Sequence, residues 1–222
     1  MMRRRRGVRR RGFRAAAAAV AFLAWVDGAG ATPLVAEVRD AQHAPVADAV
    51  VTVLPRGGAA GPAPAPQTHT IDQKNETFIP YIEVFRPGDR VVFHNSDRTR
   101  HHAYSFAPAR QFEFVLAPGE SSAPLQLSDP GVIAVGCNIH DHMITYFYVT
   151  DAPYVARTGS DGRAIIDLPD GDYEVHAWHP QRRPGTPDAG QPAHVPGAAP
   201  LTFVVPLLPD PRVAPDRERG SY

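Results

Sequence analysis

The segment CNIHDHM, at residues 137–143, holds side chains well suited to binding a transition metal. It places the thiol of Cys137, the imidazole of His140 and the thioether of Met143 at the spacing C-x-x-H-x-x-M. A thiolate and imidazoles in a trigonal arrangement, with a weak axial thioether, form the copper sites that transfer single electrons. The segment therefore predicts such a site, and one more imidazole is needed to complete it.

The missing imidazole is expected from the segment RHHAYSF, at residues 100–106. Side chains alternate between the faces of a strand, so His102 shares its face with Tyr104 and Phe106. His101 lies on the opposite face with an alanine and a serine. Because the aromatic face is expected to point into the core, we predict that His102 is the ligand. His101 is then exposed or hydrogen-bonds to the loop that carries the thiol.

Cys137 is the only cysteine, so it cannot form a disulfide within the chain. Beyond residue 31, Met143 is also the only methionine. A thiol nucleophile with His140 as its base is an alternative interpretation, but no third residue at a recognisable spacing would orient the histidine. That chemistry also gives Met143 no role, and we predict that the protein is not an enzyme.

Two further histidines lie near this chemistry. His94 is in the segment VVFHNSD and shares its strand face with Val92, so we expect it at the surface without a metal role. His142 is expected to point outward or to support a ligand by a hydrogen bond. The remaining five histidines fall in loops or away from this block and are assigned structural or solvent roles, namely His43, His69, His176, His179 and His194.

The first 31 residues have the three parts of an export signal. Eight arginines lie within residues 1–14, an apolar run follows from Ala15 to Val26, and small residues precede Thr32. The apolar run is too short to span a bilayer. Because Arg10 and Arg11 also fit a twin-arginine signal, the export route stays open, and a periplasmic location is expected.

Removal of residues 1–31 changes the charge of the protein. The full chain has 23 basic and 23 acidic residues, whereas residues 32–222 hold 15 basic and 22 acidic ones, a formal charge of −7. An acidic protein is a poor partner for nucleic acid and a suitable one for a basic protein surface. We expect a monomer with no membrane span in the mature chain.

The composition favours short strands over helices. The chain of 222 residues contains 24 prolines and 18 glycines, which interrupt helices and form turns. Turn signals such as Pro87-Gly88-Asp89 and Pro118-Gly119 recur through residues 71–150 at the spacing of a β-sandwich or barrel. The tail from residue 208 is expected to be disordered.

The block 71–150 resembles a cupredoxin, the family of plastocyanin, amicyanin and related blue copper proteins, with a ligand loop most similar to that of amicyanin. The resemblance rests on PGDRVVFHNSD at 87–97, on the histidines that follow it, and on the loop at 137–143. It implies a Greek-key sandwich that binds one copper ion, cycling between Cu(I) and Cu(II). The ligands implied are His102, Cys137, His140 and Met143.

The resemblance has two departures and one extension. Ile139 stands where family loops commonly have proline, and His142 adds an imidazole beside Met143. The whole chain also resembles the exported proteins often called methylamine utilisation proteins, which share the sequence GCNIHD of residues 136–141.

The segments on either side of this block resemble the two halves of a carboxypeptidase regulatory-like, immunoglobulin-like β-sandwich. They are VAEVRDAQHAPVADAVVTVL and TGSDGRAIIDLPDGDYEVHAW. We therefore expect the copper domain to be inserted in, or packed against, this second sandwich. The expected organisation is a signal peptide at 1–31, a discontinuous sandwich at 32–60 and 151–207, a copper domain at 67–150, and a tail at 208–222.

The expected function is outer-sphere electron transfer in the periplasm with an unidentified redox protein, a cytochrome or a dehydrogenase. The alternative is copper binding or delivery without electron transfer. Delivery proteins favour exposed Cu(I) sites rich in methionine or histidine, whereas this loop offers one methionine. Because a ligand near the surface commonly serves as the exit for the electron, we expect an apolar patch containing Ile139 over the edge of His140.

Overall fold

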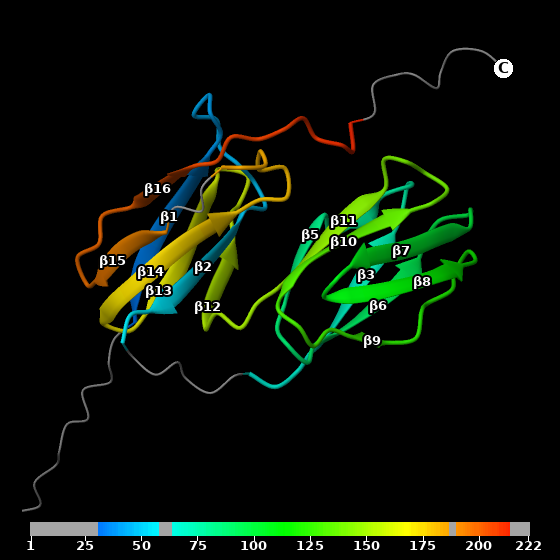
Figure 1. Cartoon of the computed structure of the whole chain (residues 1–222), viewed down its shortest axis with the longest axis horizontal. Coiled ribbons are helices and arrows are strands. Elements are labelled where there is room, and N and C mark those ends of the chain that lie inside the picture. The colour runs from blue at the N-terminus through cyan, green and yellow to red at the C-terminus, as the bar shows by residue number, and fades with distance from the viewer. Residues whose placement is uncertain (1–30, 58–63, 187–189, 214–222) are drawn as a thin grey trace, which may run out of the picture.

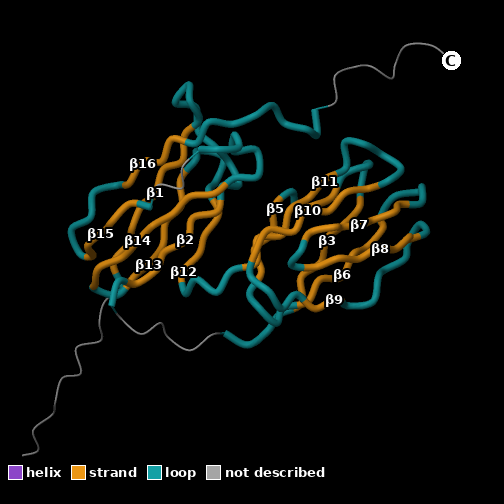
Figure 2. The backbone as a smooth tube through the Cα atoms, viewed as in Figure 1, coloured by secondary structure: helices purple, strands orange, loops and turns teal. Residues whose placement is uncertain are grey.

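The computed structural model describes residues 31–57, 64–186 and 190–213, so the predicted signal peptide lies outside the described residues except for residue 31. The described residues form sixteen strands and no helix (Figure 2), which confirms the predicted all-β class. No helix in this part of the chain could therefore cross a membrane. The strands build two β-sandwiches that lie side by side (Figure 1). We call them the central sandwich, residues 68–149, and the flanking sandwich.

The flanking sandwich is made from both sides of the central one in the sequence. Its sheets have the strand orders β13-β1-β16 and β12-β2-β14-β15. The strands are β1 (Thr32–Arg39), β2 (Val50–Pro55), β12 (Tyr154–Arg157), β13 (Arg163–Leu168), β14 (Gly171–Trp178), β15 (Gln191–Val195) and β16 (Leu201–Val204). The predicted pairing of residues 34–54 with residues 163–178 is confirmed, because β1 pairs with β13 and β2 with β14, both antiparallel.

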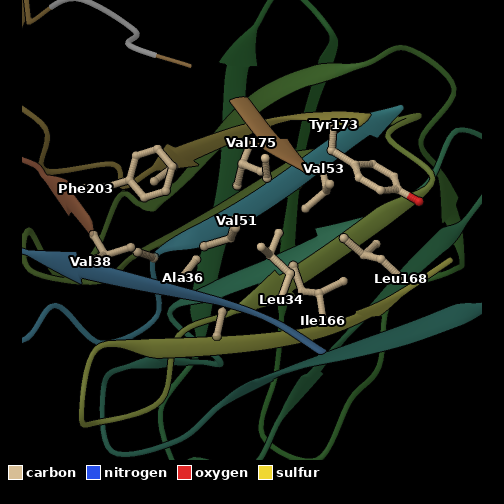
Figure 3. Close-up of a cluster of buried hydrophobic side chains, with 14 of the residues drawn as sticks. Leu34, Ala36, Val38, Val51, Val53, Ile166, Leu168, Tyr173, Val175 and Phe203 are labelled. Carbon is tan, nitrogen blue, oxygen red and sulfur yellow. The ribbon is translucent and has the colours of Figure 1, made fainter. Parts of the chain in front are cut away.

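Alternation of side chains along these strands forms the core of the flanking sandwich. Leu34, Ala36 and Val38 point inward from β1, and Val51 and Val53 point toward them from β2 (Figure 3). Each of these side chains is at most 1% exposed. Strands from the two ends of the sequence therefore share one apolar core, which fixes the points where the central sandwich enters and leaves.

The central sandwich has two sheets with the orders β4-β3-β6-β9 and β5-β11-β10-β7-β8. Its strands are β3 (Thr68–Gln73), β4 (Phe78–Ile79), β5 (Ile82–Phe85), β6 (Arg90–Asn95), β7 (His101–Ala107), β8 (Arg110–Leu116), β9 (Leu125–Gln126), β10 (Gly131–Cys137) and β11 (Ile144–Val149). The chain crosses from one sheet to the other after β4, β5, β6, β8 and β9, which gives the Greek-key connections expected from the sequence.

Aromatic side chains fill the space between these two sheets. Phe147 from β11 lies 4.9 Å from Phe85 and 5.8 Å from Phe93, measured between ring centroids. All three rings are fully buried. Cys137 and Met143 belong to the same cluster of buried side chains, so one end of this core carries the predicted metal-binding loop.

A third apolar cluster joins the two sandwiches. Trp178 of β14 contacts Tyr148 of β11, with ring centroids 4.9 Å apart. Tyr81 and Ile82 are buried in the same cluster, together with Val50 of β2. Arg86 adds hydrogen bonds to the carbonyl oxygens of residues 152 and 153. The flanking sandwich therefore covers the outer side of β5 and β11.

The C-terminal segment also contributes to this interface. After β16 the chain runs from the flanking sandwich toward the central one (Figure 1). Arg212 places its guanidinium 3.5 Å from the centre of the Tyr81 ring and forms an ion pair with Asp210 at 2.6 Å. The prediction that the disordered tail begins at residue 208 is wrong for residues 208–213, because these contacts hold them against the interface.

His179 makes the stability of this interface dependent on pH. It is 4% exposed, and burial is the main reason that its pKa falls from 6.5 to about 4; nearby Arg212 lowers it further, whereas Asp48 and Asp210 raise it. In the unfolded chain this imidazole binds a proton near pH 6.5, whereas in the folded protein it stays neutral down to about pH 4. The contribution of His179 to the free energy of unfolding is therefore complete above pH 6.5 and is lost as the pH falls toward 4. We expect His179 to account for a loss of about 2 kcal/mol between pH 7 and pH 5.

Urea unfolding at both pH values measures this contribution. His179→Gln should remove about that much of the pH dependence, whereas His43→Asn, at an exposed turn position with φ of 62°, should leave it unchanged. If the free energy of unfolding depended equally on pH in wild type and in His179→Gln, the lowered pKa of His179 would not be its cause.

Candidate metal centre

Three potential ligand atoms converge at one end of the central sandwich. They are His101 Nδ1, Cys137 Sγ and His140 Nδ1, and all three lie within 4.8 Å of one another. The sulfur is 3.9 Å from each of the two nitrogens. His101 and Cys137 are buried and His140 is partly exposed, so the cluster is closed on the core side and approached from solvent through His140.

The strands and the loop position these atoms through backbone hydrogen bonds. β7 and β10 pair antiparallel with Ala103 opposite Cys137, and the N–H of Asn138 donates to the carbonyl of residue 102 at 3.1 Å. The loop then closes on itself. The N–H of Cys137 donates to the carbonyl of Met143, and the N–H of Met143 donates to the carbonyl of His140. The thiol, His140 and Met143 are thereby brought together, with Met143 only 1% exposed.

The prediction that His102 faces the core is wrong. His101 is fully buried beside the thiol, whereas His102 lies on the outer face with its Nε2 2.9 Å from Glu113 Oε1. Phe106 on that outer face is 74% exposed. The inner face of β7 carries small residues here, because phenylalanines from β6 in the facing sheet, and from β8 and β11 in the same sheet, already fill the core beside it.

The outer face can carry aromatic rings because they pack on each other and on a glycine. The rings of Tyr104 and Phe106 lie 5.3 Å apart. A Cβ at Gly136 would lie only 3.1 Å from the Tyr104 ring, so the missing side chain of Gly136 leaves room for that ring. Aromatic residues on β7 therefore do not mark the buried face.

Asp97 fixes the orientation of His101. Its Oδ2 lies 2.8 Å from His101 Nε2, and an ionised carboxylate can only accept a hydrogen bond. The proton of a neutral imidazole is therefore held on Nε2, which leaves the Nδ1 lone pair pointing toward Cys137 Sγ. Burial would raise the pKa of Asp97, but hydrogen bonds from the N–H of Glu76, from His101 and from the N–H of Asn75 together lower it. The carboxylate thus stays ionised.

The outer edge of His140 lies against a carboxylate rather than under an apolar patch. His140 Nε2 is 3.6 Å from Glu76 Oε1, and His142 Nε2 is 4.0 Å from Glu76 Oε2. Ile139 is 51% exposed, as expected of a residue at the tip of this loop. The expectation of an apolar cover over His140 is therefore corrected: an acidic side chain contacts the imidazole there.

His94 lies where the sequence predicts it. Its neighbours on β6, Val91, Phe93 and Asn95, are all fully buried, whereas His94 points away and its Nδ1 lies 2.9 Å from the hydroxyl of Ser121. It takes no part in the cluster around Cys137.

The donor set fits a soft or borderline transition metal. A thiolate and two imidazoles suit copper or zinc, and a buried thioether beside them suits copper. Two donors bound to one ion at about 2.0–2.3 Å lie roughly 3.5 Å apart, close to the nitrogen–sulfur separations found here. The two nitrogens and the sulfur therefore need only small shifts to share one ion.

Sequence reasoning missed Asp97 and Glu76. Both lie in turns, 40 or more residues before Cys137 in the chain, and only the parallel pairing of β3 with β6 brings the two turns together. The one available signal was an acidic residue, Asp97, four positions before the histidine pair.

Comparisons with known proteins find neither a matching family model nor a matching curated protein. Among solved structures, the copper-containing nitrite reductase of Thermus scotoductus SA-01 is 25% identical, with 44% of this chain and 25% of that chain covered and a TM-score of 0.34. This chain thus spans about a quarter of the reductase.

Two smaller proteins also match. A purple cupredoxin from Nitrosopumilus maritimus is 17% identical, with 36% of this chain and 98% of that chain covered and a TM-score of 0.33. An amicyanin variant in its Cu(I) form is 16% identical, with 45% of this chain and 98% of that chain covered and a TM-score of 0.34.

Proposed function

We propose that this protein is an exported cupredoxin-type blue copper protein that transfers single electrons between redox partners. The observation that carries the proposal is the convergence of His101 Nδ1, Cys137 Sγ and His140 Nδ1 at the buried end of a β-sandwich, beside Met143. Bound copper supplies a one-electron Cu(I)/Cu(II) couple in such a site. No bond of a substrate is made or broken, so the protein is proposed to be a carrier rather than an enzyme.

The side chains around the site serve this role by keeping nearly the same positions when an electron is gained or lost. The proposed ligands are Cys137 and the imidazoles of His101 and His140, with Met143 as a weak axial ligand. Asp97 holds one imidazole, and the backbone bonds of the loop hold the other residues. A site whose ligands stay in place has a low reorganisation energy, which favours fast electron transfer.

Adding Cu(II) to the metal-free protein tests this proposal. We expect an intense blue colour, since a thiolate–copper bond gives strong charge-transfer absorption, and Cys137→Ser should abolish it. His94→Ala, at a partly exposed histidine of the same sandwich that lies outside the cluster, should keep the colour. A protein that binds copper without this colour, or releases it readily to a chelator, would instead support copper delivery.

The axial role of Met143 is tested separately. A weak thioether contributes little to affinity but favours Cu(I), so Met143→Gln should lower the reduction potential while changing copper affinity by less than about tenfold. A redox titration followed by absorption measures the potential. Adding His142→Ala to Met143→Gln shows whether His142 turns inward when the thioether is absent. An unchanged potential and spectrum in Met143→Gln would contradict the axial role.

We also propose that the protein is periplasmic. The basic, apolar and small-residue parts of residues 1–31 support this location. Expression of the full chain in a bacterium, followed by cell fractionation and N-terminal sequencing, tests it. The expected mature protein begins at Thr32 and is found in the periplasmic fraction.

A further inference from the structure

Asp97 accepts three hydrogen bonds at the edge of the candidate metal centre. Its Oδ1 accepts from the N–H of Asn75 at 2.6 Å, and its Oδ2 accepts from the N–H of Glu76 at 2.9 Å and from His101 Nε2 at 2.8 Å. Its side chain is only 13% exposed. One carboxylate therefore connects a histidine of the cluster with a turn between two other strands.

The loop that presents Asp97 is itself anchored in the core. The N–H of Asp97 donates to Asn95 Oδ1 at 3.0 Å. Asn95 is fully buried, and its amide donates to the carbonyl oxygens of Thr99 and Leu116. The position of the carboxylate is thus set by buried hydrogen bonds at the end of β6, independently of any metal.

The turn that Asp97 holds has an unfavourable backbone conformation. It joins β3 to β4, closes through a hydrogen bond from the N–H of Lys74 to the carbonyl of Thr77, and places Asn75 and Glu76 at φ of 55° and 53°. Asparagine tolerates the left-handed region, whereas glutamate has no such preference, so Glu76 is the unfavourable residue of this turn. The two hydrogen bonds to Asp97 offset part of the cost of this conformation.

The same turn carries a carboxylate to the second histidine of the cluster. Glu76 Oε1 lies 3.6 Å from His140 Nε2. Because Glu76 is about half exposed, this ion pair alone contributes little. Its position depends on the backbone of the turn, which Asp97 fixes.

We propose that Asp97 is a positioning residue of the metal centre, which orients His101 directly and also holds the turn that places Glu76 beside His140. This inference rests on the proposed function for the identity of the ion. The arrangement of hydrogen bonds does not depend on it, so the two can be tested apart.

The test compares Asp97→Ala and Asp97→Asn with Asp129→Ala, a control at an exposed turn of the same sandwich. In the metal-free protein, nitrogen NMR reports which nitrogen of His101 carries the proton. We expect wild type to hold it on Nε2, and Asp97→Ala to give a mixture of tautomers and faster hydrogen exchange at the N–H groups of Asn75 and Glu76. An asparagine keeps one acceptor oxygen but turns the other into a donor, so Asp97→Asn should be intermediate and should keep the fold.

Titration with Cu(II) alone then measures the consequence for the site. We expect Asp97→Ala to lower the affinity by about 10- to 100-fold and to shift the charge-transfer band, with a smaller effect in Asp97→Asn and none in the control. An unchanged tautomer, amide exchange and affinity in both variants would overturn the positioning role. If wild type gives no blue site with Cu(II), the proposed function fails, whereas a changed His101 tautomer in Asp97→Ala would still support the role of Asp97.

Discussion

Replacing His101 by alanine should abolish the blue copper site. The change removes one of three converging donors and leaves a fully buried cavity between Cys137 and Asp97. A trigonal site that loses one imidazole must take water or another residue in its place. We therefore expect the affinity for Cu(II) to fall by at least about 100-fold, together with loss of the intense absorption. Titration with Cu(II), followed by absorption and electron paramagnetic resonance, measures both effects.

His102→Ala is the matched control, since it changes the same residue type one position further along β7. His102 lies on the outer face beside Glu113, so its loss should leave both the colour and the affinity nearly unchanged. The opposite result, with His102→Ala colourless and His101→Ala blue, would mean that the strand faces the other way.

The contrast between the two histidines shows where sequence reasoning ends. Cys137, His140 and Met143 lie within seven residues, so the hydrogen bonds of one loop are enough to bring them together. Which face of a strand is buried is not a local property, because it depends on the side chains that pack against that face. Alternation gives two sets of side chains on β7, and only the packing of distant phenylalanines decides which set is buried.

The β11 strand, ITYFYV, illustrates the same limit at the interface. Its sequence has apolar or aromatic residues on both faces, so alternation alone cannot assign an inner side. The structure buries Phe147 in the central core and directs Tyr146 and Tyr148 toward Trp178 of the flanking sandwich. One face of β11 is covered by the central core and the other by the flanking sandwich, which accounts for apolar and aromatic residues on both. The pairing of the two flanks was predicted from their resemblance to the two halves of one sandwich, and the regular alternation of buried side chains in β1 and β13 agrees with it.

The supporting carboxylates were not predictable for a physical reason. Asp97 and Glu76 act through turns whose positions are set by the pairing of β3 with β6. A turn aspartate in a sequence indicates only a turn. Its role at His101 follows from where the neighbouring strands place it, and that placement is a property of the whole sandwich.

Replacing Phe147 by alanine should cause the largest loss of stability among the changes considered. The ring is fully buried and packs against Phe85 and Phe93, so its removal leaves a cavity in the middle of the central core. Truncation of a buried phenylalanine costs about 3–5 kcal/mol. We expect a corresponding fall in the free energy of unfolding, measured with urea on the metal-free protein.

Phe106→Ala is the control that decides whether the faces of this sheet are assigned correctly. Its ring is 74% exposed on the outer face of β7, and its loss should change the free energy of unfolding by less than about 1 kcal/mol. If Phe106 and His102 faced the core instead, Phe106→Ala would be as destabilising as Phe147→Ala and His102→Ala would lose the copper site. Two independent measurements, unfolding and copper binding, therefore test the same orientation of β7. The face of β7 that points into the core is also the face that places His101 beside Cys137.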